Sequence, residues 1–565
     1  MQPAKPGEGW ARHAQSLRAG VTALRQGPIG LHLDLSLKAL GGGEGDDAVR
    51  HAQAALNLDP HCSLAWRLIG LALEGQGDGA AALEAYQSAY AIDPQSCDIL
   101  ADLGRLANTL GLSQVAAEFF ARALALDPGS AHLAQQLSAS LRDGHEYGLA
   151  IGVIRAAIQR DPKNPSLWNA LAAILLQQGD TANALAMADE ALVHAPDWAE
   201  ARHNRAIAKL ELGDLAGALA DCDGALASAG ATEKAAIRFV RAQVKLAAGD
   251  LAPGWADYRA RLDPDFPKAP HYVAPGRAWT PEDRLEGAHM LIIGEQGLGD
   301  EIMFAGMIPD VLAALGPQGR LTLAVAPRLT SLFQRSFPTA RVLAHRTSAS
   351  QGRTVVDVPG AEAADLWAPI GALAQRFRLE VAAFDGRAPF LIPDADAVAD
   401  WRAWLAAIDD RPKVGLAWKS KKTYGHRLKH YAAFGDWAAV LTTPGVTFVN
   451  VQYGDCSEEL QAARDLGAPI WTPPGLDLTD DIDGAAALSA ALDRVIGVGN
   501  ASTNIAAAVG RPTWFVCAPT AWPTLGTGRH PWFPATRVFP AARFRDWAPT
   551  LQTAAQALAE TTHAV

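Results

Sequence analysis

A polar turn after an apolar segment is the first place where this sequence could support chemistry. The run HMLIIG (289–294) leads into Glu295–Gln296–Gly297–Leu298–Gly299–Asp300, and a segment with helical apolar spacing follows. This order predicts a strand, a glycine turn and the N-terminus of a helix. Glycines let the backbone approach a ligand closely, and the free amides at a helix start favour an anion or a polar group. Two roles stay open for Asp300: a functional carboxylate, or an N-cap worth about 1 kcal/mol.

A basic cluster follows the apolar segment VGLAW (414–418). Five cationic residues fall within eleven positions: Lys419, Lys421, Lys422, Arg427 and Lys429. Ligands of open α/β sheets bind at the carboxyl ends of strands, where a cation can neutralise a phosphate leaving group. We therefore expect Lys419 and Arg427 to bind a phosphate. The alternative is a solvated basic loop.

Two further segments offer polar groups at expected strand ends. Gln452 ends the apolar segment 446–452 and is either a ligand contact or an amide that caps the strand. The segment 498–516 predicts a strand, a polar turn and a helix of small residues. Its candidate ligand donors are Asn500, Ser502, Thr503 and Asn504.

Three carboxylates precede an alanine-rich helix expected at 485–493. They are Asp480, Asp481 and Asp483. Acidic residues at this position commonly cap a helix or interact with its dipole, and this is the role that we expect. Three carboxylates could also suggest a metal, but we expect no metal site here.

An internal repeat occupies the N-terminal part of the sequence. Prolines recur every 34 residues, at positions 60, 94, 128, 162 and 196, and glycine recurs at position 15 of most units. Small residues at positions 8, 20 and 27 allow two antiparallel helices to pack closely, while the proline stops the second helix. The pattern resembles the tetratricopeptide repeat and predicts helix pairs starting at 29, 63, 97, 131, 165 and 199. A seventh unit follows at 245–262, with Gly249 at its turn, so 1–262 should form a superhelix with a concave groove.

After the repeats, the pattern of apolar residues predicts short strands separated by amphipathic helices. A proline-rich linker is expected at 263–287, followed by two Rossmann-like halves at 288–395 and 396–545 and a C-terminal helix at 546–565. The expected strands are 289–294, 320–325, 353–358, 413–418, 446–452, 494–499 and 513–517. The expected fold class is thus an α-solenoid followed by an α/β region of two Rossmann-like halves.

Composition excludes several classes of protein. The 565 residues carry 49 Lys and Arg against 60 Asp and Glu, so the formal net charge of −11 argues against nonspecific nucleic-acid binding. The five cysteines contain no Cys-x-x-Cys pair and indicate reduced thiols in a cytoplasmic protein. No secretory signal or membrane-spanning run is visible.

The seventh unit (GDLAPGWADYRARL), Trp279 and IIGEQGLGDEIMF together resemble bacterial tetratricopeptide-repeat glycosyltransferases, whose catalytic half is similar to heptosyltransferases. The resemblance implies a metal-independent GT-B enzyme that needs no cofactor and uses a nucleotide-sugar as co-substrate. It implies that Asp300 is the catalytic base. Glu295, Gln296, Gly297 and Gly299 would then form the acceptor loop, and Lys419, Arg427, Gln452, Asn500, Ser502, Thr503 and Asn504 would bind the donor. Relatives often carry ionisable groups where this sequence has Gly499 and Asn504.

The implied activity is transfer of a sugar to Ser or Thr of a protein acceptor held by the repeats, with flagellin as the favoured acceptor. Two alternatives stay open. One is a transferase that acts on a lipid-linked or polysaccharide acceptor. The other is a non-catalytic repeat scaffold with a degenerate sugar-binding half, an idea that Gly499 and Asn504 favour.

Overall fold

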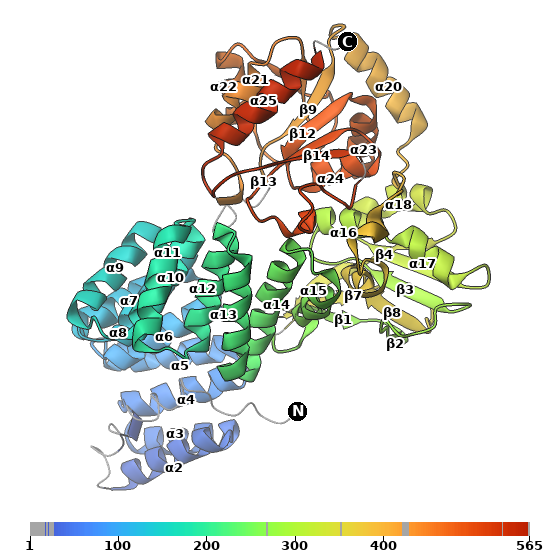
Figure 1. The fold of residues 1–565 in the computed structure, drawn as a ribbon. Coiled ribbons are helices and arrows are strands. Elements are labelled where there is room, and N and C mark those ends of the chain that lie inside the picture. The colour runs from blue at the N-terminus through green and yellow to red at the C-terminus, as the bar shows by residue number, and fades with distance from the viewer. Residues whose placement is uncertain are drawn as a thin grey trace. The chain divides into compact units, whose positions relative to one another are not determined.

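The computed structural model describes residues 17–18, 21, 27–266, 269–350, 353–420, 429–533 and 535–562 (Figure 1). The chain divides into two compact units, 1–175 and 176–565. Among the described residues, no helix has both the length and the apolar character needed to cross a bilayer.

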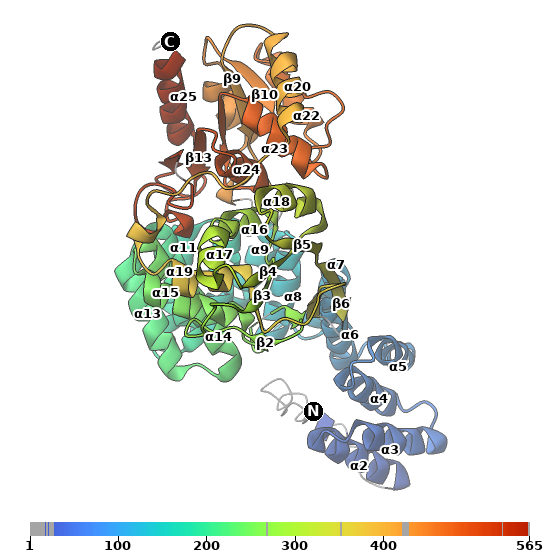
Figure 2. The ribbon, with the colours of Figure 1, turned by 90° about the vertical axis from the view of Figure 1, so that its right-hand side faces the viewer.

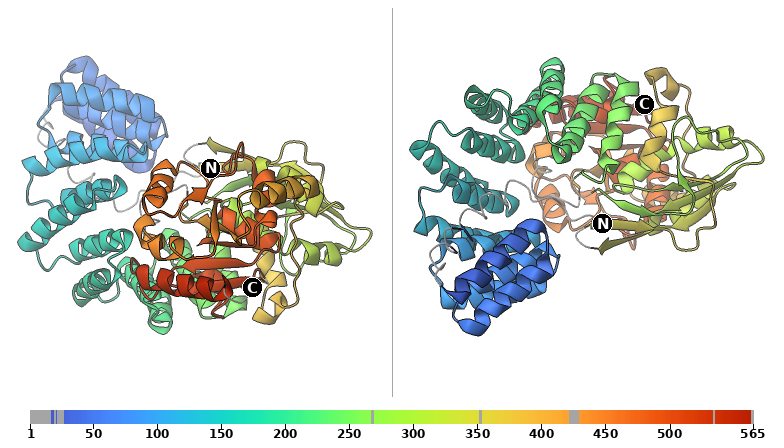
Figure 3. Two further views of the ribbon diagram at one scale, coloured as in Figure 1. Left: turned by 90° about the horizontal axis from the view of Figure 1, so that it is seen from above. Right: turned by 90° about the horizontal axis from the view of Figure 1, so that it is seen from below.

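Unit 1 consists of antiparallel helix pairs, and neighbouring helices lie side by side in Figures 2 and 3. Its helices are α2 (Pro28–Gly42), α3 (Gly45–Leu58), α4 (Ser63–Gly75), α5 (Gly79–Ile92), α6 (Cys97–Thr109), α7 (Ser113–Leu126), α8 (Ala131–Asp143), α9 (Tyr147–Arg160) and the first part of α10 (Pro165–Gln178). The starts of α4, α6, α8 and α10 confirm the 34-residue repeat predicted from the prolines.

Two repeat positions favour glycine, one because of close packing and the other because of its backbone conformation. A Cβ added to Gly70 would lie 2.4 Å from the ring of Tyr86, so position 8 must be small where an aromatic residue packs against it. Gly77 and Gly111 adopt the left-handed conformation at the turn, with φ of 83° and 77°. In the fourth unit His145 takes this position with φ 68°, a conformation that costs a non-glycine residue about 1–2 kcal/mol.

Unit 2 begins with the remaining repeat helices. They are α11 (Thr181–His194), α12 (Ala199–Leu212), α13 (Leu215–Ser228), α14 (Ala231–Ala247), α15 (Leu251–Tyr258) and the 3-10 turn η1 (Arg259–Leu262). The seventh unit is the pair α14–α15, with Gly249 at its turn in the left-handed conformation.

A five-stranded parallel sheet follows, in the order β2-β8-β3-β4-β5. Its strands are β2 (Arg277–Ala278), β3 (His289–Ile293), β4 (Arg320–Val325), β5 (Arg341–Ala344) and β8 (Leu366–Pro369). The accompanying helices and 3-10 turns are α16 (Leu298–Ala305), α17 (Ile308–Leu315), η2 (Pro327–Leu329), α18 (Thr330–Ser336), η3 (Ile370–Leu373), α19 (Ala374–Phe377) and η4 (Val381–Phe384). Strand β3 is buried along its whole length because it lies at the centre of the sheet.

The second sheet has six parallel strands in the order β11-β10-β9-β12-β13-β14. Its strands are β9 (Lys413–Ala417), β10 (Thr447–Asn450), β11 (Ile470–Trp471), β12 (Arg494–Val498), β13 (Thr513–Cys517) and β14 (Thr536–Pro540). The associated elements are α20 (Ala395–Ala406), η6 (Phe434–Trp437), α21 (Ala438–Leu441), α22 (Ser457–Asp465), α23 (Ile482–Ala491), α24 (Ala501–Ala508), η7 (Trp522–Thr524) and α25 (Ala548–Thr562). The two regions are therefore α/β layers built on parallel sheets, as the alternation of strands and helices predicts.

The prediction for 353–358 was wrong in one respect. This segment forms β7 (Arg353–Asp357), which lies outside the large sheets in a small sheet ordered β1-β7-β6, antiparallel to β6 (Arg346–Ser350). Of its residues only Val356 is buried, so β7 lacks the apolar faces of a covered parallel strand. Its parallel partner β1 (His271–Val273) comes from the expected linker.

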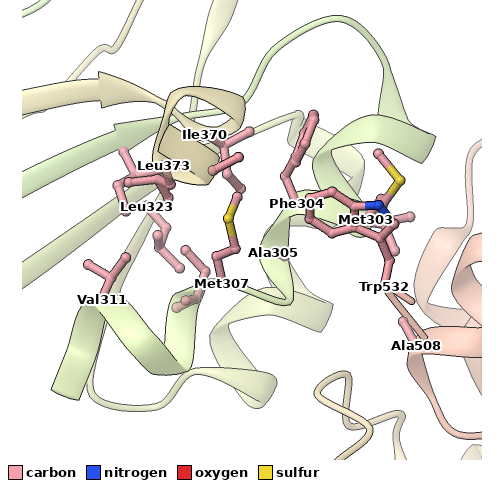
Figure 4. Packing of buried hydrophobic residues seen from close by; sticks show 14 of the residues in the cluster. Met303, Phe304, Ala305, Met307, Val311, Leu323, Ile370, Leu373, Ala508 and Trp532 are labelled. Carbon is pink, nitrogen blue, oxygen red and sulfur yellow. The ribbon is translucent and has the colours of Figure 1, made fainter. Parts of the chain in front are cut away.

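The seventh unit shares its core with both sheets. Trp255 is fully buried and its ring lies 6.0 Å from those of Trp522 and Trp532, while its Nε1 donates to the Arg378 carbonyl at 2.7 Å. Figure 4 shows Trp532, from the second α/β region, reaching Phe304 on α16, with ring centroids 5.2 Å apart. The segment 263–287 therefore does not separate two independent cores.

Candidate functional site

The turn after β3 is shaped by a buried carboxylate. Glu301 accepts a hydrogen bond from the Ala326 amide at 2.9 Å, and its Oε1 lies 3.2 Å from His345 Nε2. A Cβ on Gly294 would lie 2.4 Å from the Glu301 carboxyl group. Only glycine fits at 294 while Glu301 occupies this position, so the end of β3 and the start of α16 are matched to one another.

Gln296 holds the turn in a strained conformation. Its φ of 70° lies in the left-handed region, which costs a non-glycine residue on the order of 1–3 kcal/mol. Its side-chain Nε2 donates to the Tyr258 hydroxyl at 2.9 Å, and the hydroxyl lies 3.2 Å from Oε1. Tyr258 is the last residue of α15, so the seventh unit stabilises the strained turn.

A buried ion pair joins the same two elements. Arg261 Nε donates to Glu295 Oε2 at 2.9 Å and Nη2 donates to Oε1 at 2.6 Å, with both side chains at most 5% exposed. The Gly371 amide also donates to Glu295 Oε1, at 2.8 Å. Burial lowers the pKa of Arg261, but the charge of Glu295, the nearby tyrosines and the hydrogen bond to Glu295 together outweigh it, so the pKa lies above its ordinary value.

Asp300 is the third residue of α16, and Gly297 occupies the N-cap position. The N-cap alternative for Asp300 is therefore wrong. The side chain is half-buried and lies in the first helical turn, where the helix dipole favours its ionised form. This position leaves Asp300 at the carboxyl edge of the five-stranded sheet.

The second polar turn begins α24. Asn500 is its N-cap: Oδ1 accepts from the Thr503 amide at 3.1 Å, and Nδ2 donates to the Lys419 carbonyl at 3.0 Å. The Thr503 hydroxyl donates to the Val498 carbonyl at 2.8 Å and is fully buried. Ser502 is buried in the same turn. Thr503 therefore shapes the turn from inside, and direct donor contact by these residues remains a prediction.

Asn504 links the two polar turns. Its Nδ2 donates to the Gly299 carbonyl at 2.8 Å, and a Cβ on Gly299 would lie 3.5 Å from the Ala501 amide nitrogen. The N-terminal ends of α16 and α24 therefore meet. The structure brings Asp300, Gly299 and Asn500 to one place.

Gln452 and Lys419 lie at the adjoining strand ends. Gln452 is buried, and its Oε1 accepts from the amides of Trp418 and Lys419, both at 2.9 Å. The Lys419 ammonium group pairs with Glu459 of α22. Gln452 thus positions the backbone that carries Lys419. Arg427 lies outside the described residues.

Lys429, the last cation of the cluster, has a structural role. It is buried, donates to the Leu176 carbonyl at 2.8 Å and pairs with Glu211 of α12. Its ammonium also lies 5.2 Å from the centre of the Phe544 ring. Lys429 therefore ties the second α/β region to the last repeats.

The three aspartates before α23 are also accounted for. Asp481 caps the helix by accepting from the Gly484 amide at 2.8 Å, which confirms the expected role for this residue. Asp483 lies in the first turn of α23, also as expected, and pairs with Arg335 of the first α/β region at 2.7 Å, while Asp480 pairs with Arg328 at 3.2 Å. Across the described residues, no group of three His, Cys, Asp or Glu side chains is arranged to hold a metal.

Comparisons with known proteins support the repeat assignment. Residues 33–96 and 137–201 match the family model described as tetratricopeptide repeat. The chain is 45% identical over 338 residues to protein FlbA of Caulobacter vibrioides, an alignment that covers 59% of this chain and 56% of that relative. The chain therefore spans little more than half the length of the curated relative that it matches. Its N-terminal part consists of tetratricopeptide repeats.

Three similar solved structures each cover less than half of this chain. A tetratricopeptide repeat protein from Parabacteroides merdae is 19% identical, covering 41% of this chain and 91% of its own, with a TM-score of 0.37. MamA from Desulfovibrio magneticus is 15% identical, covering 30% and 96%, with a TM-score of 0.28. YrrB, described as having an unusual peptide-binding site, is 17% identical, covering 31% and 91%, with a TM-score of 0.27.

The side chains that sequence reasoning missed lie in the seventh unit. Trp255, Tyr258 and Arg261 are spaced three residues apart and so share one helical face. A large aromatic, a tyrosine and an arginine on one face of a terminal repeat would have signalled contact with another domain. His530 and Trp532 are buried, and burial lowers the pKa of His530 to about 3.

We predict that Arg261→Met lowers the free energy of unfolding by about 3–5 kcal/mol, because it leaves the Glu295 carboxylate buried without its cation. The double variant Arg261→Met/Glu295→Met should recover part of this loss. Denaturant unfolding followed by circular dichroism measures both.

The matched control is Arg277→Met, which breaks an exposed pair with Asp283 and should cost at most about 1 kcal/mol. Equal losses for Arg261→Met and Arg277→Met would contradict the importance of the buried pair.

Proposed function

We propose that this protein is a glycosyltransferase with a GT-B arrangement. It moves a sugar from a nucleotide-sugar donor to Ser or Thr of a protein acceptor bound by the repeats. The observation that carries the proposal is the meeting of two helix N-termini, α16 and α24, at the carboxyl edges of two parallel sheets. Ligands of α/β proteins bind at such edges, and helix N-termini favour the phosphates of a nucleotide.

The groups at this place fit the two halves of such a reaction. Asp300 stands on α16 and takes the proton of the acceptor hydroxyl. The hydroxyl oxygen bonds to the anomeric carbon of the sugar, the bond from that carbon to the phosphate oxygen breaks, and its electron pair leaves with the nucleotide. Lys419, whose carbonyl is bound by Asn500, neutralises the departing phosphate.

Donor binding requires a rearrangement of the described contacts. Asn504 is hydrogen-bonded to the Gly299 carbonyl between the two turns, and the Lys419 ammonium group is paired with Glu459. A donor must displace both. The same two contacts favour the second candidate, a non-catalytic scaffold whose sugar site is permanently closed.

The repeats supply the acceptor side of the proposal. Tetratricopeptide arrays hold protein segments in their groove, so we assign them recruitment of the acceptor. The relative at 45% identity is named FlbA, a name that hints at flagella, and flagellin is the acceptor that we favour.

We predict that Asp300→Asn lowers turnover by about 10²–10⁴-fold while donor affinity and folding persist, since only the proton acceptor is lost. The measurement is steady-state transfer to the protein acceptor, with nucleotide binding followed by calorimetry. Glu458→Gln is the matched control because it makes the same change in the first turn of another helix, α22, and should leave turnover unchanged. Turnover of Asp300→Asn within threefold of wild type would remove the carboxylate from the mechanism.

We predict opposite effects on nucleotide affinity at the Lys419–Glu459 pair. Lys419→Ala should weaken binding of nucleoside diphosphates by about 10–100-fold, because a charge-assisted contact is worth about 1.5–3 kcal/mol. Glu459→Gln should strengthen binding, because it frees the ammonium group from its internal partner. Calorimetry measures both, and Arg464→Ala, a change on the exposed part of α22, is the control. If no nucleotide binds either the wild type or Glu459→Gln, the non-catalytic scaffold is the favoured function.

A further inference from the structure

A cavity of about 690 Å³ lies beside the seventh unit, and nothing in the proposed transfer reaction uses it. Its walls come from α14, η1, residues 263–264 and 269–281, and the ends of β7 and β8. We call it the linker cavity. Ala260 and Leu262, which line it, stand on either side of Arg261, so the cavity adjoins the ion pair that holds the catalytic turn.

The side chains that line the linker cavity carry a net positive charge, whereas the whole chain is net negative. Arg238, Arg259 and Arg353 line it, against one carboxylate, Asp263. Arg238 lies 3.5 Å from Asp257, whereas within the described part of the chain Arg259 and Arg353 have no ion-pair partner. Unpaired guanidinium groups in a cavity wall favour an anionic ligand, since guanidinium binds carboxylate through two parallel hydrogen bonds.

The shape of the wall favours a ligand with a peptide backbone. Strands β1 and β2 each form the edge of their sheet among the described strands, and both line the cavity. Sheet edges offer unpaired amides and carbonyls to an extended peptide. Tyr272 and Trp367, whose ring centroids lie 5.6 Å apart, supply apolar surface for the side chains between its charges.

We propose that the linker cavity binds an extended acidic segment of the protein acceptor. This inference rests on the proposed function and names a feature of its substrate. Arg238 belongs to α14, a helix of the seventh repeat unit, so the end of the repeat array itself contributes a cation to the cavity. The bound segment is then held beside the Arg261–Glu295 pair, close to the turn that carries Asp300.

The test is binding of a fluorescein-labelled peptide in which Asp and Val alternate, measured by fluorescence anisotropy on the full-length protein without donor. Arg259→Glu/Arg353→Glu should weaken binding by at least about tenfold, because like charges replace complementary ones. The double variant should instead bind the matching Lys-Val peptide better than wild type does. Arg284→Glu reverses an exposed charge outside the cavity and should leave both affinities unchanged.

The inference is overturned if wild type binds no acidic peptide, if the double variant binds it as well as wild type, or if the Lys-Val peptide binds wild type equally well. It is also overturned if a nucleoside diphosphate displaces the peptide completely and its own affinity falls in the double variant, because the cavity is then a small-anion site. Peptide binding that needs the arginines, without sugar transfer to any acceptor, supports the cavity and rejects the proposed enzyme. Transfer to a protein acceptor that is insensitive to the double variant rejects the cavity alone.

Discussion

The buried ion pair between Arg261 and Glu295 is the contact on which the arrangement of unit 2 depends. Burying two charges costs several kcal/mol per ion unless each finds good partners. Two direct hydrogen bonds and the Gly371 amide supply those partners only when η1 lies against the end of β3. The last repeat is therefore fixed to the turn before Asp300, and the Tyr258–Gln296 contact holds that turn in its strained conformation.

The second α/β region is attached at several points around this centre. Asn504 binds the Gly299 carbonyl, Arg335 pairs with Asp483, and Lys429 reaches Glu211 in the repeats. Each contact uses a polar group that a ligand could otherwise engage. In the proposed mechanism, a donor that binds between the two sheets must therefore replace these internal contacts, so its affinity depends on the contacts between the regions.

Local sequence patterns predicted helices and strands, whereas contacts between distant residues determined how strands pair and which side chains meet. The proline and glycine spacing predicted the starts of α4, α6, α8, α10 and α12 because turn geometry depends on neighbouring residues. The edge strands β1 and β2 are too short and exposed to stand out, and β7 was placed in the wrong sheet because alternation alone does not reveal a partner. At the candidate site, the strand, glycine turn and helix were predicted, but the contacts of Arg261 and Tyr258 were missed, since their partners lie more than thirty residues away.

Intact-mass spectrometry measures sugar transfer to a protein acceptor without a label or a coupled assay. Purified flagellin and other candidate acceptors are incubated with the full-length protein and a panel of nucleotide-sugars. If the protein transfers sugar, the mass of an acceptor rises by a whole number of sugar residues when both protein and donor are present, and stays unchanged when either is left out. An acceptor that binds the protein yet keeps its mass with every donor would contradict sugar transfer and identify the protein as a scaffold.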